Sequence, residues 1–285
     1  MKEEAPLLDV KNLSVSFDTA KGRVEAVRNI SFTLGRERLG IVGESGSGKS
    51  QTGRAILGLT SGNGYTTADH VLFEGLDLAT APEVEMRAIR GARISMIMQD
   101  PRYSLNPVIK VGEQIAEAYR VHTGAGRREA RRRTIEMLER VRIREAAKVV
   151  NLYPHEVSGG MGQRIMIAMM LIPEPDILIA DEPTSALDVT VQLQVLAILD
   201  DMVRERGMGL MFISHDLNLV ASFCDRVLVM YGGQILETLS ADKLHAATHP
   251  YTRGLLNCLP ALDSPNELAI LDRDPAWFDA VASNP

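Results

Sequence analysis

The sequence has few cysteines and no long apolar run. Cys224 and Cys258 are the only cysteines among 285 residues, which excludes a disulfide framework and a four-thiolate metal site and suits a reducing compartment. The longest uninterrupted apolar segment is 165–172, whereas a membrane-spanning helix needs roughly 20 apolar residues. The first residues, Met-Lys-Glu-Glu-Ala-Pro, lack the apolar stretch of a secretory signal. We therefore expect a cytoplasmic protein that reaches a membrane only through a partner.

An excess of basic residues is also missing. The chain has 31 Lys and Arg against 37 Asp and Glu, a net charge of −6 and a pI of about 5.6. Proteins that bind nucleic acid through its phosphates are usually basic, so we expect no nucleic-acid partner. Arginines crowd residues 127–133, but Glu129 and Glu136 interrupt them. This pattern favours a solvated helix face, or contact with acidic loops of a partner, over a nucleic-acid patch.

The hydrophobic pattern predicts an α/β protein. Alternating apolar residues over 7–35 indicate an antiparallel β layer, and residues 40–42 form a short buried strand before a helix over 48–57. Strands at 177–180 and 210–213 flank an amphipathic helix at 189–204. This strand–helix–strand order predicts a parallel sheet.

Other segments add a helical insert and a C-terminal extension. Helical spacing of apolar residues occurs over 83–93, and residues 100–170 are predicted to be mostly helical. Gly232-Gly233 separates two β runs and predicts a hairpin. Beyond residue 245 the chain becomes rich in proline and aspartate, so we expect residues 246–285 to be an appendage outside the core.

A glycine-rich loop follows the short strand at 40–42. Residues 43–50 read Gly-Glu-Ser-Gly-Ser-Gly-Lys-Ser, which fits the pattern G-x-x-x-x-G-K-[ST]. Glycines let backbone N–H groups wrap closely around phosphates, and the start of the following helix adds partial positive charge. We expect Lys49 to reach the β- and γ-phosphates and Ser50 to bind Mg²⁺. The loop therefore predicts a nucleoside triphosphate site.

Two carboxylates end the apolar strand at 177–180. Asp181 and Glu182 follow it directly, and the carboxyl ends of strands face the ligand crevice in open α/β sheets. Asp181 is the expected Mg²⁺ partner, and Glu182 is the candidate general base that positions the attacking water.

Further motifs resemble those of the ATP-binding-cassette (ABC) ATPases. Residues 158–160, Ser-Gly-Gly, resemble the signature sequence of that family, and residues 185–188, Ser-Ala-Leu-Asp, resemble its D-loop. Gln99 is similar in position to the Q-loop glutamine, and His215, which follows a predicted strand, to the switch histidine. Phe17 matches the aromatic residue that stacks on adenine. These elements span residues 8–240 in the family's order.

Shorter motifs resemble the importers of oligopeptides, dipeptides and nickel. They are Gln-Asp-Pro at 99–101, Ser-Leu-Asn-Pro at 104–107 and His-Pro-Tyr-Thr at 249–252. Met161 and the helix after it resemble the first of the two ATPase subunits in such importers. Many relatives carry a cysteine-rich tail with an iron–sulfur cluster. Because Cys258 stands alone beyond residue 224, we predict no cluster.

The chain departs from the family pattern at four positions. Val157 and Met161 stand where the signature usually has Leu and Gln, Gly162 where the subfamily usually has Arg, and Gln51 where Thr or Val is usual. Gly costs about 1 kcal/mol of helix propensity relative to Ala, so we expect a looser helix start at Gly162. The Gln51 change puts a side-chain contact to the α-phosphate in question.

The resemblance implies a P-loop ABC ATPase domain over 7–245, with a parallel-sheet core, an antiparallel β subdomain and an inserted helical subdomain over about 100–170. Its catalytic and metal residues are Glu182, His215, Gln99, Ser50 and Asp181. The implied ATP-binding residues are Phe17, Gly43, Glu44, Ser45, Gly46, Ser47, Gly48, Lys49, Ser50 and Gln51. The implied signature residues, which serve the opposite site, are Ser158, Gly159, Gly160 and Met161. The implied D-loop residues are Ser185 and Asp188.

The resemblance also implies partners. Two ATPase subunits, identical or different, would sandwich two ATP molecules head to tail, with Mg²⁺, and residues 99–106 would press on membrane permease subunits. An external solute-binding protein would act indirectly. The chain would lie at the inner face of the plasma membrane as the ATP-hydrolysing subunit of an importer for oligopeptides, dipeptides or a related solute such as nickel.

Other functions of ABC ATPases stay open at this point. A DNA-associated ABC ATPase needs a long coiled-coil arm or zinc modules between Gly48 and Ser158, and the sequence there contains neither. A translation-type ABC protein carries two cassettes, whereas one P-loop occurs here. A regulatory subunit that binds ATP without splitting it is disfavoured by the presence of Glu182 and His215.

Overall fold

The computed structural model describes residues 5–98, 104–185 and 187–257. The chain divides into two compact units. Unit 1 combines the residues up to Ala79 with those from Phe212 onward, and unit 2 comprises Thr80–Met211. None of the described helices is long and apolar enough to span a bilayer.

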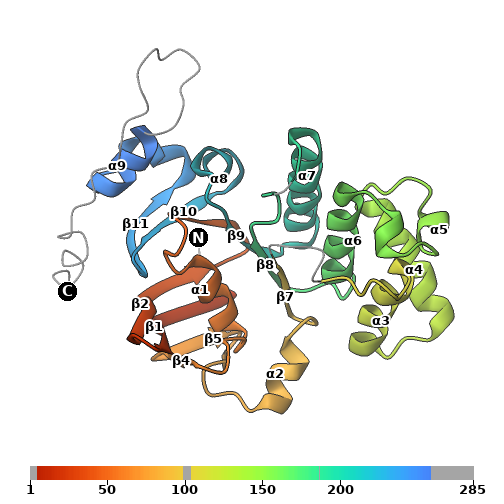
Figure 1. The fold of residues 1–285 in the computed structure, drawn as a ribbon, viewed down its shortest axis with the longest axis horizontal. Helices are drawn as coiled ribbons and strands as arrows, with labels where there is room; N and C mark the ends of the chain where they lie inside the picture. Colours follow the sequence, from red (N-terminus) through yellow and green to blue (C-terminus); the bar gives the residue numbers. More distant parts are fainter. Residues whose placement is uncertain (1–4, 99–103, 186, 258–285) are drawn as a thin grey trace. The chain divides into compact units, whose positions relative to one another are not determined.

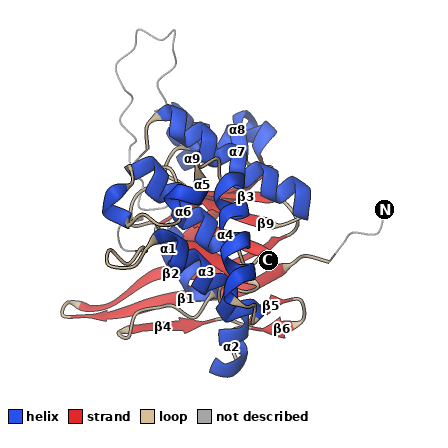
Figure 2. Ribbon diagram, turned by 90° about the vertical axis from the view of Figure 1, so that its right-hand side faces the viewer, coloured by secondary structure: helices blue, strands red, loops and turns tan. Residues whose placement is uncertain are grey.

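Unit 1 contains the antiparallel β layer that the sequence predicts. Its strands pair in the order β2-β1-β5-β6, and β4 also pairs with β1 (Figure 2). Apolar residues of β1 alternate into the core, and a register shift between Val10 and Leu13 coincides with a left-handed Asn12. The strands of this layer are β1 (Leu8–Thr19), β2 (Gly22–Leu34), β4 (Gly64–Thr67), β5 (His70–Phe73) and β6 (Leu76–Asp77).

A second group of strands in unit 1 leads into the glycine-rich loop. Strand β3 (Arg38–Val42) runs parallel to β10 (Arg226–Tyr231), which forms the predicted hairpin with β11 (Gln234–Ser240). Helix α1 (Lys49–Ile56) follows the loop, as expected. Helix α8 (Leu217–Phe223) packs on β3 so closely that a Cβ at Gly40 would lie 2.2 Å from a methyl carbon of Val220.

The start of the C-terminal segment belongs to the core, contrary to the sequence-based expectation. A 3₁₀ helix, η3 (Ala241–Ala246), follows β11 and leads to α9 (Pro250–Asn257). Tyr251 and Thr252 of α9 are completely buried. A high proline content is typical of an exposed extension, but the side chains of Tyr251 and Thr252 pack in the interior of unit 1. Residues 258–285 lie outside the described residues.

Unit 2 contains two parallel strands, β7 (Ile94–Ile97) and β8 (Ile177–Asp181). Helix α7 (Val189–Arg206) connects β8 to β9 (Gly209–Ile213), the strand in which the division between the units falls. The three strands lie in the order β9-β8-β7 in the sheet, so β8 and β9 are neighbours joined by a helix, as the sequence predicts. The helix predicted over 83–93 is shorter: α2 (Glu83–Ile89) ends because Arg90 is extended and Gly91 adopts a positive φ of 80°.

The predicted helical insert is present in unit 2. Helix α3 contacts both α4 and α6, as the yellow to green segments of Figure 1 show. Ile115, Leu138 and Ile165 are completely buried among them, so the insert has its own apolar core. Its elements are α3 (Val111–Thr123), α4 (Arg127–Arg140), α5 (Ala146–Val149), the 3₁₀ helix η2 (Pro154–Glu156) and α6 (Gly159–Leu171).

Candidate functional site

The glycine-rich loop in unit 1 is wound tightly between β3 and α1. Gly46 and Gly48 have φ values of 80° and 98°, in the left-handed region that glycine adopts at no steric cost. A Cβ at Gly48 would lie 2.3 Å from the carbonyl oxygen of Ala26, and one at Gly43 would lie 2.0 Å from that of Met230. Side chains at these two positions would therefore push the loop off the strands beside it.

Lys49 carries a buried positive charge inside this loop. The residue is 6% exposed, and Nζ donates hydrogen bonds to the carbonyl oxygens of Gly43 at 2.8 Å and Glu44 at 2.7 Å. Helix α1 has no acidic residue in its first turn, so its positive N-terminal end is not neutralised locally. The amide groups, the helix end and the ammonium group together fit a phosphate chain.

His215 follows the strand next to the loop. The Ser214 amide donates to the carbonyl oxygen of Ile41 in β3 at 3.1 Å, which fixes the end of β9 beside the strand that enters the glycine-rich loop. Asp216 then caps α8 by accepting a hydrogen bond from the Leu219 amide at 3.0 Å. His215 is exposed between these two anchored residues, so the backbone on both sides of the imidazole is fixed.

Phe17 lies near the end of β1 in unit 1. It pairs with Val24 on β2 and with Gly64 on β4. A Cβ at Gly64 would lie 2.7 Å from a ring carbon of Phe17, so the missing side chain leaves room for the ring. Phe17 is only half-buried, and its remaining surface suits the predicted stacking on a base.

The two predicted carboxylates lie at the carboxyl end of β8 in unit 2. Asp181 is 2% exposed, whereas Glu182 is half-buried. Glu182 has a φ of 46°, a left-handed conformation that costs a non-glycine residue free energy and occurs often at functional sites. The amide and hydroxyl groups of Ser185 both donate to the Glu182 carbonyl oxygen, at 3.3 and 3.2 Å. The D-loop serine thus holds the backbone that carries the candidate base.

The signature residues form the start of α6. Ser158 is the N-cap, and its hydroxyl accepts a hydrogen bond from the Met161 amide at 3.3 Å. Ser158 and Gly159 are exposed, so this helix end is accessible to an anion. Asp188 caps α7 in the same way, by accepting from the Val191 amide at 3.0 Å. The predicted Q-loop glutamine, Gln99, and the D-loop residue Ala186 lie outside the described residues.

Gln163 connects the signature helix to the loop after Glu182, which the sequence analysis missed. Its buried side-chain amide donates to the carbonyl oxygen of Pro183 at 2.6 Å. A glutamine two residues before the apolar segment 165–172 was the available signal, because a buried amide needs a partner.

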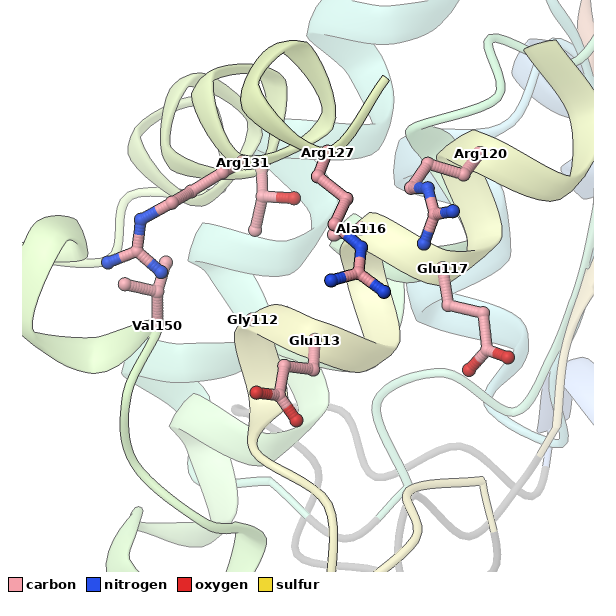
Figure 3. A pocket seen from close by; sticks show the side chains of 9 residues that line it. Gly112, Glu113, Ala116, Glu117, Arg120, Arg127, Arg131 and Val150 are labelled. Carbon is pink, nitrogen blue, oxygen red and sulfur yellow. The ribbon is translucent and has the colours of Figure 1, made fainter. Parts of the chain in front are cut away.

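A charged hollow of about 420 Å³ lies between α3 and α4 in unit 2. Figure 3 shows Arg127 and Arg131 projecting from α4, and Glu113, Glu117 and Arg120 from α3. Arg127 extends toward α3 near Ala116. The predicted arginine-rich helix face therefore lines a hollow that also contains carboxylates.

The fold and the motifs define an ABC ATPase cassette. A family model described as "ABC transporter" matches residues 27–185, and the chain belongs to this family. The solved structure described as the dimeric post-hydrolysis state of the ATP-binding cassette MJ0796 bound to ADP and phosphate has a TM-score of 0.74. It is 26% identical in sequence, and the match covers 82% of this chain and 98% of that one.

The curated proteins that are similar to this chain have names that also state a transported solute. The oligopeptide transport ATP-binding protein OppD of Haemophilus influenzae is 49% identical over 92% of this chain and 81% of its own length. The protein of the same name from Escherichia coli K12 is 48% identical over 92% of this chain and 78% of its own length. A putative peptide import ATP-binding protein of Brucella abortus is 51% identical over 91% and 79%.

Proposed function

We propose that this chain is the ATP-hydrolysing subunit of an importer for oligopeptides. The observation that carries the proposal is the buried Lys49 inside a loop wound for phosphate, in a chain about half identical to peptide-import ATPases along nine-tenths of its length. No described feature favours a DNA-associated or purely regulatory role.

The side chains fit ATP and a divalent cation. Lys49 and the amides of residues 45–48 would hold the phosphates, and Phe17 would stack on adenine. Ser50 in the first turn of α1 and the buried Asp181 supply hydroxyl and carboxylate oxygens, the ligands that Mg²⁺ prefers. Gln99 is the third expected ligand. Bound Mg²⁺ supplies positive charge that offsets the charge developing on the phosphates.

We assign general base action to Glu182 and γ-phosphate sensing to His215. Ser185 holds the left-handed backbone of Glu182 directly after β8. A carboxylate on a fixed backbone accepts a proton from the attacking water with little reorganisation. Lys49 would donate to phosphate oxygens, so that its positive charge offsets the negative charge of the phosphates.

The signature helix completes the site of a second subunit in this proposal. Ser158 and Gly159 present an exposed helix end, which suits the γ-phosphate held by the opposite P-loop. ATP thus joins two subunits, and hydrolysis releases them. Homodimers and heterodimers both satisfy this geometry.

We infer that the helical insert contacts the membrane permease subunits. The hollow between α3 and α4 presents Arg120, Arg127 and Arg131 beside Glu113 and Glu117, so it matches a polar segment with acidic side chains. Asn106, which follows the predicted Q-loop, is held by Gln114. The side chain of Gln114 accepts a hydrogen bond from the Asn106 amide and donates one to the Asn106 carbonyl oxygen. In this proposal the chain lies at the cytoplasmic face of the membrane.

Co-purification and transport test the proposal directly. The tagged chain, extracted from its native membranes, is expected to bring permease subunits that mass spectrometry identifies, and the reconstituted complex should import labelled oligopeptides with ATP. The variant Lys49→Ala, which lacks the phosphate-binding ammonium group, should abolish uptake while the complex still assembles. ATP hydrolysis stimulated by DNA, without permease subunits in the preparation, would overturn the proposal.

A further inference from the structure

The Glu237 carboxylate of β11 holds the backbone just before α9. Glu237 Oε1 accepts hydrogen bonds from the amide and hydroxyl groups of Thr248, at 2.7 and 3.0 Å, and Oε2 accepts one from the His249 amide at 3.3 Å. Burial raises the pKa of the Glu237 carboxyl, but the hydrogen bonds that it accepts lower this pKa by more. The pKa of Glu237 is therefore below its usual value. The clamp fixes the backbone at His249, directly before α9 begins and two residues before Tyr251.

Tyr251 joins this segment to the glycine-rich loop. The side chain is completely buried, and its ring lies 4.6 Å from that of Tyr231 at the end of β10. Its hydroxyl oxygen accepts a hydrogen bond from the Glu44 amide at 3.2 Å. A side chain 207 residues further along the chain thus holds the second residue of the phosphate-binding loop.

The same stretch of loop is held from its other side by Lys49. The ammonium group donates to the carbonyl oxygens of Gly43 and Glu44, and it must redirect part of this bonding to reach a phosphate chain. The Tyr251 hydroxyl contacts an amide instead, so nothing requires that bond to break when nucleotide binds. After Lys49 moves, Tyr251 and the close contact of Gly43 with Met230 remain to hold the start of the loop.

We propose that Tyr251 is a positioning residue for ATP capture, acting through the Glu44 amide to keep the phosphate-binding loop wound. The C-terminal segment is therefore part of the nucleotide site's support. This role concerns ATP affinity alone and goes beyond the transport function, because it does not depend on which solute the importer carries.

The test compares Tyr251→Phe with the unchanged full-length chain. Phenylalanine keeps the ring against Tyr231 and removes only the hydroxyl group. Loss of one such hydrogen bond should weaken binding of Mg²⁺-ATP about fivefold, measured by calorimetry, while kcat at saturating ATP stays the same because the reacting groups are intact. An unchanged dissociation constant would overturn the proposal.

Two control variants separate positioning from general destabilisation. Tyr119→Phe removes a hydroxyl bonded to Glu129 at 3.4 Å in unit 2 and should leave ATP affinity unchanged. Thr248→Val removes one of the three hydrogen bonds to Glu237, that of the Thr248 hydroxyl, without touching the Tyr251 hydroxyl. If Thr248→Val lowers ATP affinity as much as Tyr251→Phe for the same loss of thermal stability, the hydroxyl group has no positioning role and the proposal is wrong.

Discussion

The side-chain amide of Gln163 donates a hydrogen bond to the backbone carbonyl of Pro183, 20 residues away along the chain. Gln163 belongs to the signature helix α6, and Pro183 directly follows the candidate base Glu182. The donor is 3% exposed, so water cannot replace it easily. This bond connects the signature helix with the loop that carries the Glu182 carboxylate.

Replacing this amide should weaken both stability and catalysis. Gln163→Met keeps the length of the side chain but leaves the Pro183 carbonyl oxygen buried without its donor, at a cost of about 1–3 kcal/mol. We expect a lower free energy of unfolding in urea and a reduced kcat, because the loop that carries Glu182 loses its support.

The matched control is Gln192→Met in the neighbouring helix α7. Gln192 is half-buried, and surface-type changes of this kind usually stay within about 0.5 kcal/mol. Equal stability of the Gln163→Met protein and the unchanged protein would contradict the assigned role of the hydrogen bond.

Gly162 offers a second prediction, on stability alone. A Cβ at Gly162 would have nothing within 4 Å, whereas one at Gly160 would lie 3.0 Å from a methyl carbon of Val191. Gly162→Ala should therefore stabilise α6 by about 1 kcal/mol through helix propensity, seen as a higher melting temperature. Gly160→Ala should gain less or lose stability, since Val191 must move. A lower melting temperature for Gly162→Ala would contradict the prediction that a methyl group at this position is accommodated without strain.

The sequence predicted most of this fold, because its signals are local. Alternating apolar residues mark β1 and β2, and the G-x-x-x-x-G-K-[ST] pattern marks the loop before α1. Asp181, Glu182 and Ser158 were found in the same way, from strand ends and motif order. The structure places Asp181 at the end of β8 with Glu182 directly after it, and it makes Ser158 the N-cap of α6.

Long-range contacts were not predictable from such local patterns. Tyr251 follows a proline and precedes a polar, proline-rich tail, which is typical of an exposed extension, yet its ring fills a space beside Tyr231. The partner of Gln163 is likewise set by tertiary packing. The positive φ of Glu182 also lacks a sequence signal, because glutamate has no preference for that conformation.

The His249 side chain should make stability depend on pH. Its Nδ1 accepts a hydrogen bond from the Tyr251 amide at 3.1 Å, which requires the neutral ring. Burial lowers the pKa of His249 more than the nearby Glu237 carboxylate raises it. The folded state therefore binds protons less readily than the unfolded state, and stability present above about pH 6.5 is lost as the pH falls.

Urea unfolding at pH 7.5 and pH 5.5 checks this prediction. The matched variant is His249→Asn, because an Asn side chain can accept from the amide two residues further on and does not titrate in this range. The unchanged protein should lose more free energy of unfolding between the two pH values than the variant does. Identical losses would show that His249 does not contribute.

ATP turnover by Glu182→Gln tests the central claim, that this chain hydrolyses the ATP held by its glycine-rich loop, most directly. The amide keeps the shape of the side chain but cannot accept a proton, so kcat should fall at least about 100-fold, while the dissociation constant of Mg²⁺-ATP measured by calorimetry stays the same. Hydrolysis at the rate of the unchanged protein would contradict the assignment of Glu182 as the base and, with it, the proposed route of catalysis.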